Sequence, residues 1–146
     1  MAGDNTLQVE DWNGAVGERW AAEQERTDQL IRAFGDAALT AARASLGERV
    51  LDVGCGCGDT SLALANSVGP TGHVLGVDVS APMLIVARRR ASALSNLTFA
   101  EADASSASLP GSFDLLYSRF GVMFFDAPVP AFRHLHKAMS PTGRLA

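Results

Sequence analysis

The stretch RVLDVGCGCGDTSLALA, residues 49–65, constrains the fold more than any other part of the sequence. A short apolar run ends at Val53, three glycines then alternate with two cysteines, and a helix-forming segment follows from Asp59. Because glycine has no Cβ, a glycine-rich turn after a strand lets the backbone approach a ligand closely. The pattern predicts a buried strand, a ligand-binding turn and a helix.

Strand-like and helix-like segments alternate along the rest of the chain. Helices are predicted from Asp59 or Thr60, after Ser80 as a cap, and over residues 127–139. The predicted strands are 48–53, 73–79, 97–103, 113–120 and the start of a fifth at 143–146. Such alternation indicates an α/β fold with a Rossmann-like, mostly parallel sheet and helices on both faces.

The chain divides into two parts near residue 47. Residues 1–47 predict a helical leader, with one or two helices between Gly17 and about Leu46 and Gly35 as a break. Residues 48–146 hold the alternating segments and form the α/β domain. The formal net charge of −4 argues against a nucleic-acid partner. No segment is long and apolar enough for a membrane span or a signal peptide, so we expect a cytoplasmic protein.

The spacing of the glycines separates two classes of ligand. A dinucleotide-binding turn reads G-x-G-x-x-G and points a helix N-terminus at a pyrophosphate. Here the glycines are Gly54, Gly56 and Gly58, and Asp59 stands where that pattern needs its last small residue. Asp52 and Asp59 would also repel an anion, so the loop favours a positively charged ligand over a nicotinamide dinucleotide.

Two further acids follow the next two predicted strands. Asp78 stands where a carboxylate accepts hydrogen bonds from both hydroxyls of a ribose. Asp103 stands where a carboxylate could accept from an exocyclic amine such as that of adenine. Each has a plainer alternative, since Asp78 could begin a helix and Asp103 could form a turn. Together with the loop they favour a nucleoside with a cationic tail, which describes S-adenosylmethionine.

On these segments the chain resembles the class I S-adenosylmethionine-dependent methyltransferases. It is similar in particular to the small-molecule enzymes related to the ubiquinone and menaquinone C-methyltransferases. The resemblance covers residues 48–146 and also DWNGAVGERW near the start. Its main segments are LDVGCGCG, VDVSAPML, AEADASSASLP, FDLLYSRFGVMFF and LHKAMSPTGRLA. It implies methyl transfer from S-adenosylmethionine to a small-molecule acceptor by in-line displacement.

The resemblance implies cofactor contacts for ten residues. They are Asp52, Gly54, Gly56, Gly58, Asp78, Val79, Met83, Asp103, Ala104 and Ser118. At the methionine end, the three glycines would let the backbone pass under the cofactor, and Asp52 would orient the loop and favour the ammonium group. Ser118, after the fourth predicted strand, would lie near the methyl group.

The nucleoside end takes the other five of these residues. The resemblance implies that Asp78 binds the ribose hydroxyls. Val79 and Met83 would pack on the adenine face. Asp103, with the backbone of Ala104, would read the adenine edge.

The remaining chemically active side chains have no motif that assigns them a role. Cys55 and Cys57 have no further cysteines with which to build a zinc site, so we expect small packing residues and no metal. No catalytic residue can be assigned; the candidates by type are Tyr117, Arg119, His134 and His136. Four aromatic residues could belong to the core or to the wall of the site: Trp12, Trp20, Phe124 and Phe125.

The resemblance also raises a question about the sheet. Similar enzymes have seven strands, whereas this sequence ends within the predicted fifth, so we expect an incomplete version of that fold. The apolar strand at 113–120 would then lie at an edge and invite pairing with another chain, for example in a homo-oligomer. Two alternatives stay open: a non-catalytic cofactor-binding or interaction fragment, and a nicotinamide-dependent oxidoreductase, which the glycine spacing disfavours.

Overall fold

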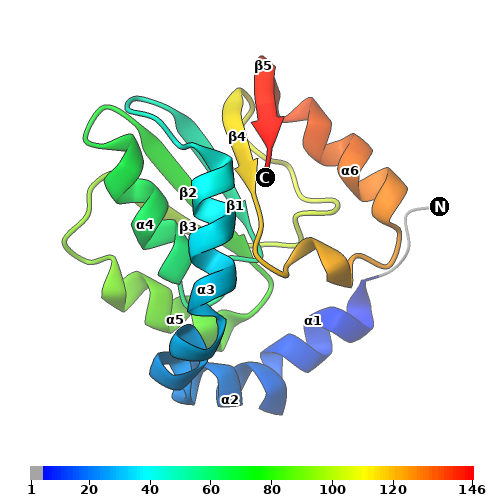
Figure 1. The fold of residues 1–146 in the computed structure, drawn as a ribbon. Helices are drawn as coiled ribbons and strands as arrows, with labels where there is room; N and C mark the ends of the chain where they lie inside the picture. Colours follow the sequence, from blue (N-terminus) through cyan, green and yellow to red (C-terminus); the bar gives the residue numbers. More distant parts are fainter. Residues whose placement is uncertain (1–4) are drawn as a thin grey trace.

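Five parallel strands form one sheet in the order β3-β2-β1-β4-β5 (Figure 1). The computed structural model describes residues 5–146. The strands are β1 (Arg49–Val53), β2 (His73–Asp78), β3 (Leu97–Glu101), β4 (Phe113–Tyr117) and β5 (Met139–Leu145). The strand order reverses between β1 and β4, and the predicted Rossmann-like α/β fold is confirmed.

Helices cover both faces of this sheet. The elements are α1 (Thr6–Asn13), α2 (Ala15–Ala22), α3 (Gln24–Ala42), α4 (Asp59–Val68), α5 (Ala81–Arg90), the 3-10 helix η1 (Val122–Phe124) and α6 (Pro128–Lys137). Helices α3, α4 and α5 pack on one face, and α6 packs on the other (Figure 1). None of the helices within residues 5–146 combines the length and apolar character that crossing a membrane needs.

Alternate residues of the central strands supply the two halves of the core. In β1, Val50 packs towards α3 and α4, while Leu51 and Val53 pack towards α6. In β4, Leu115 belongs to the first side and Leu116 to the second. A parallel strand buried on both faces reads as a nearly continuous apolar run, which is why these segments were recognisable from the sequence.

The N-terminal region differs from the predicted leader in one respect. Gly35 lies buried inside α3 and does not break it. A Cβ at this position would lie 2.6 Å from the Arg119 Nη1 atom, so glycine here makes room for that arginine. The start of α4 also differs, because Gly58 is the N-cap in a left-handed conformation and Asp59 is the first helical residue. The predicted Ser80 cap of α5 is confirmed.

The edge of the sheet beyond β4 is formed by β5, whereas the sequence predicted an edge at residues 113–120. β5 begins at Met139, four residues before the predicted start, and pairs with β4 through an irregular register between Phe113 and Leu115. β4 is therefore an internal strand, and the prediction that it lies at an edge is wrong. β5 carries Pro141, which an edge strand tolerates because one side of its backbone needs no partner. A homo-oligomer that shields an open edge of the sheet stays a prediction.

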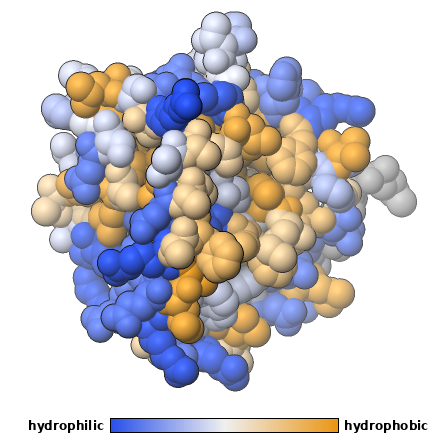
Figure 2. All heavy atoms as spheres, in the orientation of Figure 1, coloured by the Kyte–Doolittle hydropathy of each residue, from blue (hydrophilic) through white to orange (hydrophobic). Residues whose placement is uncertain are grey.

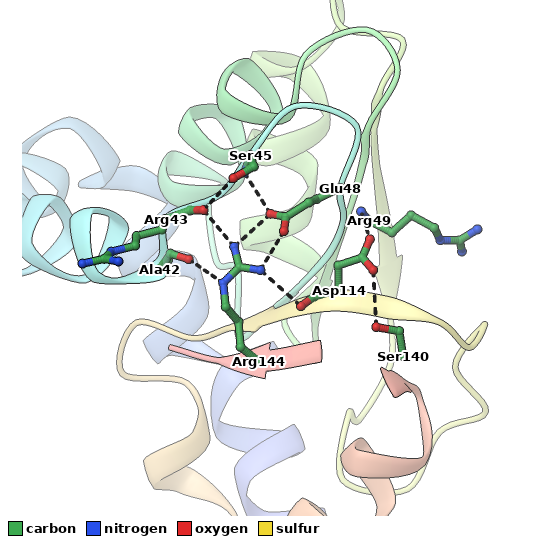
Figure 3. A network of polar contacts seen from close by, with 8 residues as sticks. All are labelled: Ala42, Arg43, Ser45, Glu48, Arg49, Asp114, Ser140 and Arg144. Carbon is green, nitrogen blue, oxygen red and sulfur yellow. Dashed lines mark hydrogen bonds and ion pairs between the residues drawn. The ribbon is translucent and has the colours of Figure 1, made fainter. Parts of the chain in front are cut away.

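Arg144 of β5 contacts the C-terminus of α3, Glu48 before β1, and the Asp114 carbonyl of β4 (Figure 3). Its guanidinium donates to both carboxylate oxygens of Glu48, at 2.7 and 2.9 Å, and to the carbonyl oxygens of Ala42 and Arg43 at 2.9 and 2.8 Å. Those two carbonyls lie at the C-terminus of α3, where helix carbonyl groups have no partner within the helix. The Arg144 contact also holds the pKa of Glu48 below its ordinary value.

We predict that Arg144→Met lowers the free energy of unfolding by about 1–3 kcal/mol, because it leaves a carboxylate and two helix-end carbonyls without their charged donor. Urea denaturation measures the change. Arg144→Lys should recover only part of the loss, since lysine cannot make the paired contact with Glu48. Arg133→Met is the matched control: Arg133 is exposed on α6, and its removal should change stability by less than about 0.5 kcal/mol. Equal losses in the Arg144 and Arg133 variants would contradict the prediction.

Candidate functional site

A pocket opens at the carboxyl ends of the first four strands. Its walls come from the turns after β1, β2, β3 and β4, and α1, α2 and α3 close it from the other side. Seven of the ten predicted cofactor residues line it: Gly54, Gly56, Asp78, Val79, Met83, Asp103 and Ala104. The structure thus brings the turns after three strands together at one site, as parallel strands require.

The glycine loop and Asp78 form one wall of this pocket. Asp78 accepts a hydrogen bond from the Gly56 backbone N–H at 2.7 Å and another from the Ser80 N–H at 2.9 Å, one on each carboxylate oxygen. Gly56 has a positive φ of 53°, and a Cβ there would lie 2.8 Å from the Met83 Cε atom. Burial raises the pKa of Asp78 above its ordinary value. A side chain at Gly56 would disturb both the backbone and the Met83 side chain beneath it.

Asp52, Gly58 and Ser118 are near the pocket but do not line it. Asp52 is fully buried behind the loop, and one of its oxygens accepts hydrogen bonds from the hydroxyls of Thr60 and Ser61 at 2.9 and 2.6 Å. Desolvation, partly offset by these hydroxyls, raises the pKa of Asp52 to about 6. These contacts join the end of β1 to the start of α4, and the loop-orienting and ammonium-binding roles of Asp52 stay predictions.

Gly58 and Ser118 have packing partners that explain their positions. A Cβ at Gly58 would approach Ala87 of α5 to 3.1 Å, so this glycine lets α5 pack closely. The Ser118 hydroxyl donates to the Val53 carbonyl at 2.8 Å and accepts from the Val122 N–H at 3.2 Å. Ser118 therefore ties the turn after β4 to the end of β1, one layer behind the pocket surface.

Asp103 forms a local turn and also lines the pocket. One carboxylate oxygen accepts from the Ser105 N–H at 2.9 Å, which forms a local turn. The residue also lines the pocket next to the buried Ala104. A carboxylate oxygen accepts more than one hydrogen bond, so the turn leaves Asp103 with acceptor capacity on the pocket side.

The N-terminal helices cover the site through contacts that the sequence did not reveal. The Asn13 side chain donates to the Val79 carbonyl at 2.7 Å and accepts from the Ala81 N–H at 2.9 Å. The Ser80 hydroxyl donates to the Trp12 carbonyl at 2.7 Å. All four aromatic residues left open above line the pocket: Trp12, Trp20, Phe124 and Phe125. Trp12 contacts both Trp20 and Phe124 edge to face.

Two arginines neutralise acids around the glycine loop. Arg119, after β4, lies 3.1 Å from one Asp59 oxygen, and Arg90 lies 3.5 Å from the other and 3.0 Å from Asp28. Arg90 also donates to the Cys57 carbonyl at 2.9 Å. Asp59 is therefore paired on both oxygens, and its charge repels an anion less than the sequence suggested. No sequence motif marked Asp28 or Arg90.

The two thiols are poor candidates for chemistry. Cys55 and Cys57 are buried, and neither is in a disulfide. Burial raises the pKa of Cys57 to about 11 and that of Cys55 well above its ordinary value, so both stay protonated at neutral pH. Within the described residues, no group of three or more His, Cys, Asp or Glu side chains could hold a metal ion.

Of the four residues considered as catalytic by type, Arg119 alone lines the pocket. Tyr117 is fully buried, its hydroxyl has no hydrogen-bond partner within residues 5–146, and burial raises its pKa to about 12. His134 contacts the Ala107 carbonyl at 2.7 Å, away from the site. An arginine stays protonated in proteins and cannot act as a base, so the walls described here offer binding groups and no obvious proton acceptor other than carboxylates.

Comparison with known proteins gives one family match over most of the domain. Residues 50–143 match the family described as a methyltransferase domain. Over 98 residues the chain is 34% identical to demethylmenaquinone methyltransferase of Staphylococcus aureus, which covers 66% of this chain and 41% of that enzyme. The chain therefore spans about two fifths of the length of this curated relative.

Two solved structures are similar to the chain in both fold and sequence. An S-adenosylmethionine-dependent methyltransferase from Mesorhizobium loti superposes with a TM-score of 0.66 and 32% identity, covering 75% of this chain and 50% of that one. A phosphoethanolamine N-methyltransferase 2 from Haemonchus contortus, solved with phosphomonomethylethanolamine and S-adenosylhomocysteine, gives 0.70 and 29%, covering 77% and 27%.

The buried Asp52 predicts a pH-dependent stability. Its pKa is 3.8 in an ordinary setting and about 6 in the fold, so between these values the folded state keeps a proton that the unfolded state has released. Raising the pH from 4 to 7 should therefore remove stability, by at most about 3 kcal/mol. Asp52→Asn cannot titrate. We expect the unfolding free energy of the native protein, measured in urea and relative to that of Asp52→Asn, to fall as the pH rises from 4 to 7. Plots of unfolding free energy against pH that run parallel for the two proteins would contradict the prediction.

Proposed function

Because the chain belongs to the methyltransferase domain family, whose members are S-adenosylmethionine-dependent class I enzymes, we propose that it binds S-adenosylmethionine and transfers the methyl group to a small-molecule acceptor. The observation that carries the proposal is the wall in which the Asp78 carboxylate holds the Gly56 N–H. In this wall a carboxylate with unused acceptor capacity lies directly beside a turn in which Gly56 has no room for a side chain, and both features support the proposal.

The residues of the pocket fit the proposed cofactor in three respects. Asp78 has acceptor capacity beyond its two backbone contacts and suits the ribose hydroxyls. Asp103 and Ala104 form the far wall, where the adenine edge needs an acceptor for its amine. Gly54 and Gly56 have positive φ values of 71° and 53°, and both line the pocket without a side chain. Acidic walls suit the positive charges of a sulfonium and an ammonium group.

The chemistry proposed here asks the protein mainly for positioning. S-adenosylmethionine, when bound, supplies a methyl group that is already activated on a sulfonium. The walls of the site must then align the acceptor with that methyl group and exclude water. The aromatic cluster of Trp12, Trp20 and Phe124 serves the second task, because it covers the pocket from the side of α1 and η1. A general base is needed only for an acceptor that is protonated before transfer.

The mouth of the pocket favours an apolar acceptor. Phe120 lines the pocket and is 47% exposed. Its ring contacts edge to face that of Phe34 of α3, which is 62% exposed and lies outside the pocket lining. Figure 2 shows apolar side chains across the centre of this face and hydrophilic ones below it. Phe120 has a positive φ of 62°, which is unusual for a bulky residue and holds its ring at this position. These features support an aromatic acceptor more than a charged one.

Both alternatives drawn from the sequence are weaker. A nicotinamide oxidoreductase is disfavoured by the glycine spacing and finds no support in the family match. A non-catalytic binding fragment shares the cofactor site, and methyl transfer is the measurement that separates it from an enzyme.

For cofactor binding, we predict that the chain binds S-adenosylhomocysteine in isothermal titration calorimetry and does not bind NADH. Asp78→Asn should weaken S-adenosylhomocysteine binding by about 10- to 100-fold, because a buried carboxylate acceptor is lost. Asp114→Asn is the matched control: Asp114 also accepts from a backbone N–H, that of Arg49, but on the side of the sheet away from the pocket. NADH binding, or equal effects of the two variants, would contradict the proposal.

For the acceptor, we predict methyl transfer from S-adenosylmethionine to 1,4-naphthoquinol in preference to phosphoethanolamine, followed as release of S-adenosylhomocysteine. Phe120→Ser should lower kcat/KM for the naphthoquinol by about tenfold through lost apolar contact, because Phe120 lines the pocket. Leu46→Ser, a substitution of an exposed apolar residue outside the pocket lining, should leave it unchanged. Preference for the charged acceptor would overturn the assignment of an apolar one.

A further inference from the structure

The charged side chains on the pocket walls are mostly acidic. Asp28, Asp59, Asp78 and Asp103 line the pocket, and Arg119 is the single cationic side chain among the described lining residues. The amino-acid tail of the proposed cofactor carries an ammonium group and also a carboxylate. Carboxylates on the walls suit the ammonium and would repel the carboxylate, so the carboxylate needs a different partner.

The order of the strands fixes where that partner must lie. Along the sheet edge, the turn after β3 carries Asp103, the turn after β2 carries Asp78, the turn after β1 is the glycine loop, and the turn after β4 carries Arg119. A nucleoside held by Asp103 and Asp78 directs its tail along the glycine loop. The far end of that tail then falls at the turn after β4.

Arg119 is held firmly but keeps most of its hydrogen-bonding capacity. Its side chain is 12% exposed and lies against Gly35 of α3, where a Cβ would come within 2.6 Å of the Arg119 Nη1 atom. Within residues 5–146, its guanidinium makes one hydrogen bond, from Nη1 to Asp59. A guanidinium has five N–H donors, which leaves enough for a paired contact with a carboxylate.

Arg90 differs from Arg119 because its guanidinium already has several partners in the protein. Arg90 already contacts Asp28, Asp59 and the Cys57 carbonyl, and it does not line the pocket. Because Arg90 also neutralises Asp59, Arg119 could turn part of its guanidinium towards a ligand without leaving that acid unpaired.

We propose that Arg119 binds the α-carboxylate of the cofactor's amino-acid portion, while the acids on the opposite walls favour its ammonium group. The inference rests on the proposed cofactor binding and goes beyond it, because it assigns one residue to one ligand group. Arg119 is a binding residue in this account and takes no part in moving a proton.

The test compares two ligands that differ only in that carboxylate. S-adenosylhomocysteine and its decarboxylated analogue, S-adenosyl-3-thiopropylamine, are titrated into the full chain by calorimetry. Arg119→Met should weaken S-adenosylhomocysteine binding by about 10- to 100-fold and change binding of the analogue by less than about twofold. Arg119→Lys should lose less, since it keeps the charge but not the paired geometry.

Arg90→Met is the control, because it also removes a cation from Asp59 but one outside the pocket lining. It should leave the ratio of the two affinities at the native value. A native ratio in Arg119→Met would overturn the inference while leaving cofactor binding intact. If the native chain binds neither ligand, the proposed function fails and this inference fails with it.

A second measurement needs no substitution. In the native protein, the Arg119 Nε–H signal in a ¹⁵N spectrum, assigned by its loss in Arg119→Lys, should shift when S-adenosylhomocysteine is added and stay in place with the decarboxylated analogue. Equal shifts with both ligands would contradict a contact to the carboxylate. This result does not depend on how well the Arg119→Met variant folds.

Discussion

The site depends on a steric contact between two backbone turns. A Cβ on Gly54 would lie 2.6 Å from the Gly121 Cα atom, and a Cβ on Gly121 would lie 2.5 Å from the Val53 carbonyl oxygen. Only two glycines allow the turn after β1 to meet the turn after β4 at this distance. The Ser118 hydroxyl bonds both sides of the same junction. Because the strands are neighbours at the point where their order reverses, this contact places Arg119 and Phe120 beside the glycine loop.

The aspartates around that contact differ in their hydrogen-bond and ion-pair partners. Asp52 is buried, and one of its oxygens accepts from two hydroxyls at the start of α4, whereas the other has no hydrogen-bond partner within residues 5–146. Asp59 is paired with two arginines, and Asp28 with one of them. Asp78 is left with free acceptor capacity towards the pocket. An acidic loop thus becomes a surface with one cationic end, because tertiary contacts neutralise some of its charges and leave others open to a ligand.

Much of the fold and half of the site could be predicted from local patterns. The strands are apolar runs because both faces of a parallel sheet are buried, and β1 to β4 lie where those runs are. The glycine loop, Asp78 and Asp103 follow strand ends, and parallel strands bring such turns to one edge. The errors were local: Gly35 lies within a helix because a neighbouring side chain needs its space, and β5 begins early because pairing with β4 outweighs the poor strand propensity of Pro141.

The sequence by itself determined the fold class, the glycine loop and the acids that follow the strands, since each of these depends on residue type and spacing along the chain. The tertiary structure decided which side chains face the pocket. Asp52 and Ser118 lie behind its surface, whereas Arg119, Asp28 and Trp12 reach it from segments far apart in the sequence. A pattern along one strand or helix carries no information on contacts between α3, the turn after β4 and the N-terminal helices, because packing across elements creates those contacts.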